Sequence, residues 1–78
     1  MANMVRVSNM SEMTTEEQVR ALFDQAGKVQ SVQLVTNQDG NSVGAAIVEL
    51  RNQSEVDTAI HLLDGQQYDN HTIQVTQA

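Results

Sequence analysis

Residues 43–50 most constrain what this chain can fold into, because they form a compact apolar segment at its centre. Their side chains are small or aliphatic, apart from the single charge of Glu49. A turn-forming stretch, residues 39–42, precedes the segment, and a helix-starting stretch, residues 52–55, follows it. Such a segment between a turn and a helix start is typical of a central β-strand.

Three further stretches alternate apolar and polar residues, which indicates strands with one buried face. They are residues 4–8, 29–35 and 72–76. Residues 37–41 contain Asp, Gly and Asn, which adopt positive φ at low energetic cost, so they predict a hairpin before the central strand.

A first helix is predicted after residue 13. Capping-box spacing allows two pairings at its start, Thr14 with Glu17 or Thr15 with Gln18. Apolar residues then recur at helical spacing, and Gly27 is a natural stop.

A second helix is predicted after the central strand. Asn52 and Glu55 form its capping box, and residues 64–65 (Asp-Gly) end it. The residues expected to face inward from it are Val56, Ala59, Ile60 and Leu63.

The predicted order is therefore β-α-β-β-α-β. This order gives an α+β, ferredoxin-like plait, a four-stranded antiparallel sheet with both helices on one face. A chain of 78 residues has room for one such domain, residues 1–78. The residues expected to face the helices are Val5, Val7, Val32, Leu34, Ala46, Val48, Ile73 and Val75. Those expected on the open face are Arg6, Ser8, Ser31, Gln33, Val35, Ala45, Ile47, Glu49, Gln74 and Thr76.

The net charge of −6 is unusual for a nucleic-acid-binding domain, which normally carries a basic surface. Six of the ten acids fall on the predicted helices and are expected on solvated helix faces. They are Glu16, Glu17, Asp24, Glu55, Asp57 and Asp64. The open sheet face is therefore expected to be less acidic than the net charge suggests.

Several kinds of chemistry lack support in this sequence. No residues have catalytic spacing, so neither an enzyme nor a small-molecule substrate is expected. With no cysteine, and with His61 and His71 on different elements, no metal or cofactor is expected. No apolar run reaches membrane-spanning length, so no membrane partner is expected. The missing cysteines fit an intracellular protein, without distinguishing nucleus, cytoplasm and organelle.

The local sequence resembles the RNA recognition motif family from residue 4 to residue 77. Residues 43–50 lie where that family has its signature octapeptide, and Gly44, Ala46 and Val48 match it. Residues 5–10 resemble the second signature, and residues 14–23 and 59–65 resemble the two helices.

The resemblance implies binding of single-stranded RNA on the open sheet face, where aromatic rings stack on bases and contribute about 1–3 kcal/mol each. At the stacking positions this chain has Arg6, Ala45 and Ile47, so we expect a divergent member that binds RNA weakly. The residues expected to contact nucleic acid are Arg6, Ser8, Asn9, Lys28, Gln33, Ala45, Ile47, Gln74, Thr76 and Gln77.

A protein-interaction module of the same fold is the alternative, and it accounts better for the charge and the missing rings. One version uses an aliphatic sheet patch, Val35 with Ala45 and Ile47, for a partner or for self-association. The other uses the acidic helical surface, Glu16 and Glu17 with Tyr68. Residues 66–68 occupy the place of an Arg-x-Phe tripeptide in a protein-binding branch of the family that captures a tryptophan. A simpler role for Tyr68 is to pack on the core with its hydroxyl in water.

Overall fold

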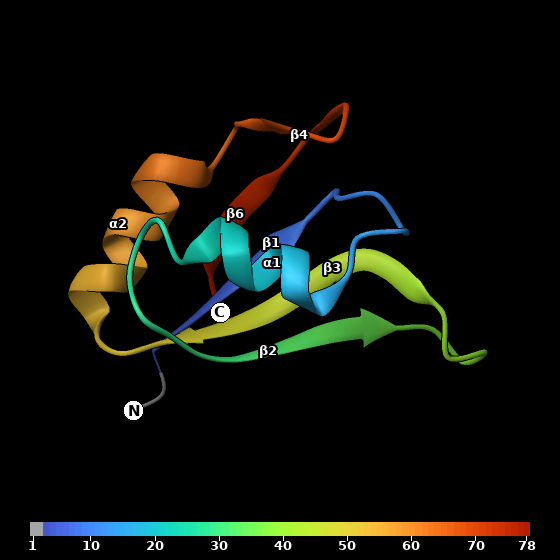
Figure 1. Cartoon of the computed structure of the whole chain (residues 1–78), viewed down its shortest axis with the longest axis horizontal. Coiled ribbons are helices and arrows are strands. Elements are labelled where there is room, and N and C mark those ends of the chain that lie inside the picture. Colours follow the sequence, from blue (N-terminus) through green and yellow to red (C-terminus); the bar gives the residue numbers. More distant parts are fainter. Residues whose placement is uncertain (1–2) are drawn as a thin grey trace.

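The computed structural model describes residues 3–78 and confirms the predicted plait. The elements are β1 (Met4–Ser8), α1 (Glu16–Phe23), β2 (Val29–Thr36), β3 (Ser42–Leu50), α2 (Gln53–Leu63), β4 (Gln67–Tyr68), β5 (His71–Thr72) and β6 (Gln74–Gln77). β1, β2, β3 and β6 form one antiparallel sheet in the order β2-β3-β1-β6 (Figure 1). The central strand of the sequence, β3, is thus an inner strand paired on both sides.

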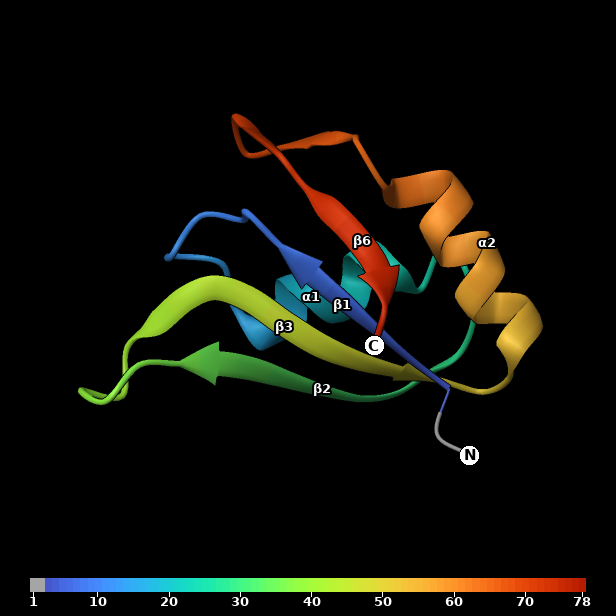
Figure 2. The same ribbon diagram turned by 180° about the vertical axis from the view of Figure 1, so that it is seen from behind.

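Both helices cover one face of this sheet, and the other face is open (Figure 2). The core lies between the two layers, where Phe23 of α1 and Val56 of α2 are fully buried. Seven of the eight residues expected to face the helices are buried, and Leu34 is half-buried against the same core. The alternation of each strand therefore assigned its faces correctly.

Thr15 and Gln18 form the capping box of α1, so the second of the two predicted pairings is the one present. The Gln18 N–H donates to Thr15 Oγ1 at 3.2 Å, and the Thr15 N–H donates to Gln18 Oε1 at 2.9 Å. The regular helix ends at Phe23, earlier than expected. The Phe23 carbonyl accepts from the N–H groups of Ala26 and Gly27, which continue the chain as turns.

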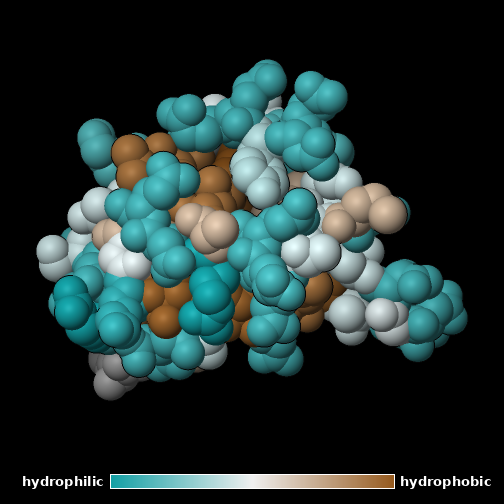
Figure 3. Space-filling view, in the orientation of Figure 1, coloured by the Kyte–Doolittle hydropathy of each residue, from teal (hydrophilic) through white to brown (hydrophobic). Residues whose placement is uncertain are grey.

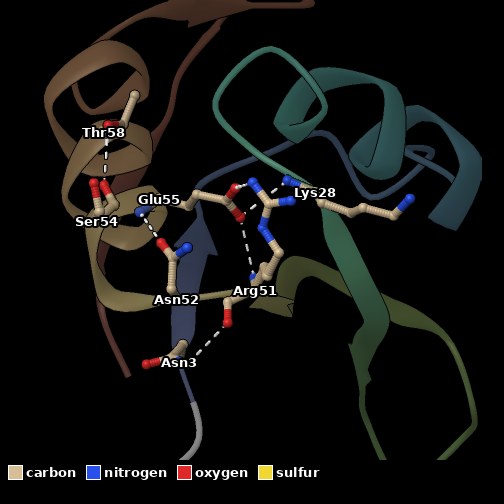
Figure 4. Close-up of polar contacts among 7 residues, drawn as sticks. All are labelled: Asn3, Lys28, Arg51, Asn52, Ser54, Glu55 and Thr58. Atoms are coloured by element: carbon tan, nitrogen blue, oxygen red, sulfur yellow. Dashed lines mark hydrogen bonds and ion pairs between the residues drawn. The ribbon is translucent and has the colours of Figure 1, made fainter.

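Glu55 is buried in the structure, and its expected place on a solvated helix face is wrong. Its Oε1 atom accepts from the backbone N–H of Lys28 at 3.0 Å and of Arg51 at 3.1 Å. Its Oε2 atom pairs with Nη2 of Arg51 at 2.5 Å (Figure 4). The Asn52 side chain caps α2 as predicted, accepting from the Glu55 N–H. The Glu55 carboxylate accepts from Arg51 and not from the Asn52 N–H, so the second hydrogen bond of the predicted capping box does not form.

The Glu55 carboxyl group joins the loop before β2 to the start of α2. A Cβ atom on Gly27 would lie 2.5 Å from Glu55 Cδ, so a larger residue there would displace the carboxyl group from this position. Burial raises the pKa of Glu55, but the N–H groups of Lys28 and Arg51 and the Arg51 guanidinium outweigh it. The pKa of Glu55 is therefore lowered.

A small hairpin, β4 and β5, lies between α2 and β6 where a loop was expected. Its turn residues Asp69 and Asn70 both have positive φ, at 53° and 65°. Residues 71–72 pair with this hairpin, so the last strand of the sheet begins at Gln74 and the expected 72–76 range is shifted. Tyr68 of β4 packs against the core, as predicted.

Candidate nucleic-acid interface

The open sheet face has a central row of four residues, one from each strand. The strand registers place Gln33 opposite Ile47, Ile47 opposite Arg6, and Arg6 opposite Thr76. The structure therefore brings together, in one line across the sheet, four of the ten residues expected to contact nucleic acid.

Arg6 is an exposed cation in this row. Within residues 3–78 the structure contains one ion pair, between Arg51 and Glu55, so Arg6 has no acidic partner there. The carboxylate of Glu49, the nearest acid on the sheet, accepts from the Ser31 hydroxyl at 3.2 Å. The Arg6 guanidinium is thus available to a planar or anionic ligand.

The expectation that Ala45 would be exposed is wrong, since only 3% of it is accessible. Its methyl group lies on an inner strand directly opposite the larger Val35, which is itself half-buried. The expected aliphatic patch is therefore reduced to two half-buried residues, Val35 and Ile47. Ala45 has very little surface to offer to any ligand.

Gly44 sets the path of β3 beside this face. Its φ is +77°, and a Cβ atom there would lie 2.2 Å from the carbonyl oxygen of Met10. The Gly44 carbonyl accepts from the Met10 N–H at 2.9 Å. Only glycine permits both the left-handed backbone and this close approach.

Asn9 and Ser8 lie at the end of β1. Asn9 has a φ of +62°, and its side-chain amide donates to the Thr72 carbonyl at 2.8 Å. This bond fastens the end of β1 to β5, a structural role that sequence reasoning missed. Ser8 is half-buried and lies opposite Gln74, which is exposed.

Gln77 and Lys28 lie apart from the central row. The Gln77 side chain turns to the helix layer, where it exchanges hydrogen bonds of 2.9 and 3.1 Å with the amide of Gln53. It therefore does not belong to the open face. Lys28 is exposed in the loop before β2, and its side chain points away from Glu55 (Figure 4).

Neither aromatic side chain of the protein lies on the open face. Phe23 is fully buried beneath the sheet, and Tyr68 packs against the core from the β4–β5 hairpin. The three positions where the resemblance places stacking rings carry Arg6, Ala45 and Ile47. Any base stacked on this face must therefore lie on a guanidinium or an aliphatic group.

The helix side carries a hollow of about 300 Å³ between the C-terminal ends of α1 and α2. Its lining residues are Leu22, Gln25, Leu62, Leu63, Gln66 and Gln67. Hydrophobic surface is visible beside the last turn of α2, among hydrophilic residues (Figure 3). Glu16 and Glu17, the two acids expected on the helical surface, are exposed in the first turn of α1, at the other end of that helix from the hollow.

Neither helix in the described part of the chain has the length and hydrophobicity that crossing a bilayer requires. The same residues contain no group of three or more side chains placed to hold a metal ion.

A family model described as RNA recognition motif matches residues 5–74 of this chain. The putative RNA-binding protein RbpB of Nostoc sp. is 35% identical over 75 residues, which are 95% of this chain and 73% of that protein. A crystal structure titled RNA Binding Protein PG1 superposes with a TM-score of 0.92 at 27% identity, covering 97% of this chain and 93% of the other.

Other relatives are much longer than this chain. It is 29% identical over 69 residues to the U4/U6 recycling protein spliceosome associated factor 3 of Danio rerio, covering 88% of this chain and 7% of that protein. Across four of the curated relatives that it matches, the chain spans between 7% and 28% of their length.

Proposed function

The chain belongs to the RNA recognition motif family, and on this premise we propose that residues 1–78 act as one module that binds single-stranded RNA through the open sheet face. The observation that carries the proposal is the exposed Arg6, which lies in the central row without an acidic partner within residues 3–78. The proposal includes neither catalysis nor a cofactor, and it places the protein inside the cell.

Arg6 is proposed as the main RNA contact. A guanidinium plane can stack on a base or form paired hydrogen bonds with a phosphate. Ile47 beside it offers an apolar surface for a base, and Gln33 and Thr76 at the ends of the row offer hydrogen-bond donors and acceptors. Single-stranded RNA fits this arrangement because its unstacked bases can lie flat on a sheet.

Binding by this module is proposed to be weak. Each aromatic ring that stacks on a base contributes about 1–3 kcal/mol, and this face has none. With one cation on the face, few phosphates are neutralised, so affinity falls only slightly with salt. The chain is in this respect a divergent member of its family, and a neighbouring domain would raise its affinity through tethering.

The test is a ¹⁵N amide titration of the protein with mixed-sequence single-stranded RNA at low salt. Shifts at Arg6, Gln33, Ile47 and Thr76 are expected. Arg6→Gln is expected to weaken binding about tenfold, because a hydrogen bond to a charged group is lost. Lys28→Gln, with the same change in net charge away from the row, is the matched control and should weaken binding less than about threefold. Equal losses in both variants would contradict a role for the central row.

A second candidate function, binding of a protein partner, is favoured by the hollow between the helices. Leu62 is 42% exposed beside this hollow, which is large enough for one aromatic side chain. The sheet version of this candidate loses support because Ala45 is buried. Glu16 and Glu17 on α1 favour a basic partner by their charge.

A peptide with one tryptophan between lysines is a suitable probe for this second candidate. Its addition should shift the amides of Leu22 and Leu62 and leave those of the central row unchanged. The Leu62→Gln variant should lose these shifts while remaining folded, because the side chain is partly exposed already. No shifts at about 1 mM peptide would remove the candidate.

A further inference from the structure

We propose that the outer edge of β2 is a self-association surface, on which the β2 strand of a second copy of this chain pairs in antiparallel orientation. The two sheets would then form one continuous sheet across a two-fold axis. The proposal rests on backbone groups of β2, on its sequence and on the contrast between the two edges of the sheet.

The direction of the backbone groups follows from two hydrogen bonds of β3. The Gly44 carbonyl accepts from the Met10 N–H at 2.9 Å, and the Leu50 N–H donates to the Asn3 carbonyl at 2.8 Å. The backbone N–H and C=O groups of the even-numbered residues of β3 therefore point to β1. Because these groups alternate in direction along a strand, those of the odd-numbered residues point to β2.

Ile47 is one of these odd-numbered residues, and it lies opposite Gln33. Gln33 therefore points its N–H and C=O groups to β3, and its neighbours Val32 and Leu34 point theirs away from the sheet. These four outward groups have no hydrogen-bond partner within residues 3–78. They are a template onto which another strand can add.

The opposite edge of the sheet, β6, is covered by the chain itself. The Val75 N–H donates to Asp64 Oδ1 at 2.9 Å. The Ile73 N–H donates to the Gln66 carbonyl, and the Ile73 carbonyl accepts from the Gly65 N–H, both at 2.9 Å. One edge of the sheet is thus closed by residues 64–66.

Edge strands that stay single usually carry charges, proline or a covering segment. Residues 29–36 have no charge and no proline, and no helix or strand lies on the outer side of β2 in either view (Figures 1 and 2). Within the described residues, one bond reaches β2 from outside the sheet, from Arg20 Nη1 to the Val29 carbonyl at 3.3 Å. The pairing of β2 with β3 shifts register at Gln30 and again between Val35 and Thr36, so the regular part of the strand is residues 31–35.

A second copy fits this edge because β2 is complementary to itself. A two-fold axis at Gln33 places Val32 of each copy opposite Leu34 of the other, which gives four hydrogen bonds between the outward groups. The side-chain amides of the two Gln33 residues lie next to each other on the open face. Lys28 lies just before β2 and Asp39 in the turn after it, so in this orientation the end of each strand that carries a cation lies beside the end of the other that carries an anion.

The two copies also repel each other, since each carries a net charge of −6. Added salt screens this repulsion, so association should strengthen with ionic strength. This dependence has the opposite sign to that of RNA binding.

Sedimentation equilibrium of the chain without RNA tests the proposal, at about 1 mM protein and about 0.5 M NaCl. A monomer–dimer equilibrium is expected, together with slower hydrogen exchange of the Val32 and Leu34 amides as concentration rises. A chain that remains monomeric, or a dimer in which these amides are unchanged, overturns the proposal.

Charge variants at Gln33 test the register. Gln33→Lys sets like charges opposite each other and should weaken association at least about fivefold. A mixture of Gln33→Lys and Gln33→Glu chains should restore it. Gln74→Lys, the matched control on the covered edge of the same face, should associate like the unsubstituted chain. Equal association of the Gln33→Lys chain and the control overturns the proposed register.

Discussion

Asn9 and Thr72, 63 residues apart in the sequence, are joined by a 2.8 Å hydrogen bond from the Asn9 side-chain amide to the Thr72 carbonyl. Because Asn9 also has positive φ, two separate requirements meet at one residue. Asparagine meets both, since it adopts the left-handed region more readily than most residues.

Two substitutions at Asn9 separate these requirements. Asn9→Gly removes the side-chain bond but keeps the backbone relaxed, and should lower the free energy of unfolding by about 1 kcal/mol. Asn9→Ala also strains the backbone, and should lower the free energy of unfolding by about 1 kcal/mol more. Urea denaturation measures both. Equal stability of the two variants would contradict a requirement for positive φ.

Gly44 is expected to tolerate no side chain. Gly44→Ala combines positive φ with a Cβ atom 2.2 Å from the Met10 oxygen, so it should lower the free energy of unfolding by more than about 3 kcal/mol. Gly40 is the matched control, because its φ is +83° but no atom lies within 4 Å of its added Cβ. Gly40→Ala should lower the free energy of unfolding by about 1 kcal/mol. Thermal unfolding measures the stability of both variants. The difference between them gives the cost of the close contact, because Gly40→Ala introduces backbone strain alone.

Glu55 should make the stability of the domain depend on pH. Its pKa is lower in the folded chain than its ordinary value near 4.5, so the folded state favours the charged carboxylate. This contribution is fully present above about pH 4.5 and is lost as the pH falls through the lower folded pKa.

The Glu55→Gln variant checks this dependence by denaturation from neutral to acidic pH. Its deficit in stability should be largest near neutral pH and should shrink as the unsubstituted chain becomes protonated. A deficit of constant size across that range would show that the carboxylate charge is not what stabilises this contact.

An aromatic ring on the open face should strengthen RNA binding. Ile47→Phe places a ring beside Arg6 in the central row, and stacking of one base should raise affinity about fivefold to a hundredfold. Val43→Phe is the control, since Val43 is 44% exposed but lies outside the row. Fluorescence anisotropy with labelled single-stranded RNA measures both. An equal gain from the two rings would argue against binding through the row.

The sequence predicts those features that depend on neighbouring residues. Alternation assigned the two sheet faces, and the Thr15 and Gln18 pair is a local signal of a helix start. The β4–β5 hairpin also had a local signal, because Asp69-Asn70 is a pair that favours positive φ.

The features that were missed depend on residues far apart in the chain. Glu55 is buried because Lys28, 27 residues away, donates to it. Alternation with Val75 already places Gln77 on the helix side, but its hydrogen bonds with Gln53, 24 residues away, have no local signal. Such contacts follow from the packing of the layers, which no local pattern encodes.

The bonds of Glu55 also determine how the domain can open locally. One carboxylate bonds the backbone of Lys28 and of Arg51, so the loop before β2 and the start of α2 cannot fray independently. A fluctuation that frees one segment releases the other, which makes the two a single cooperative unit. The amides of Lys28 and Arg51 therefore become exposed to solvent together, and exchange at either amide also detects the opening of the other segment.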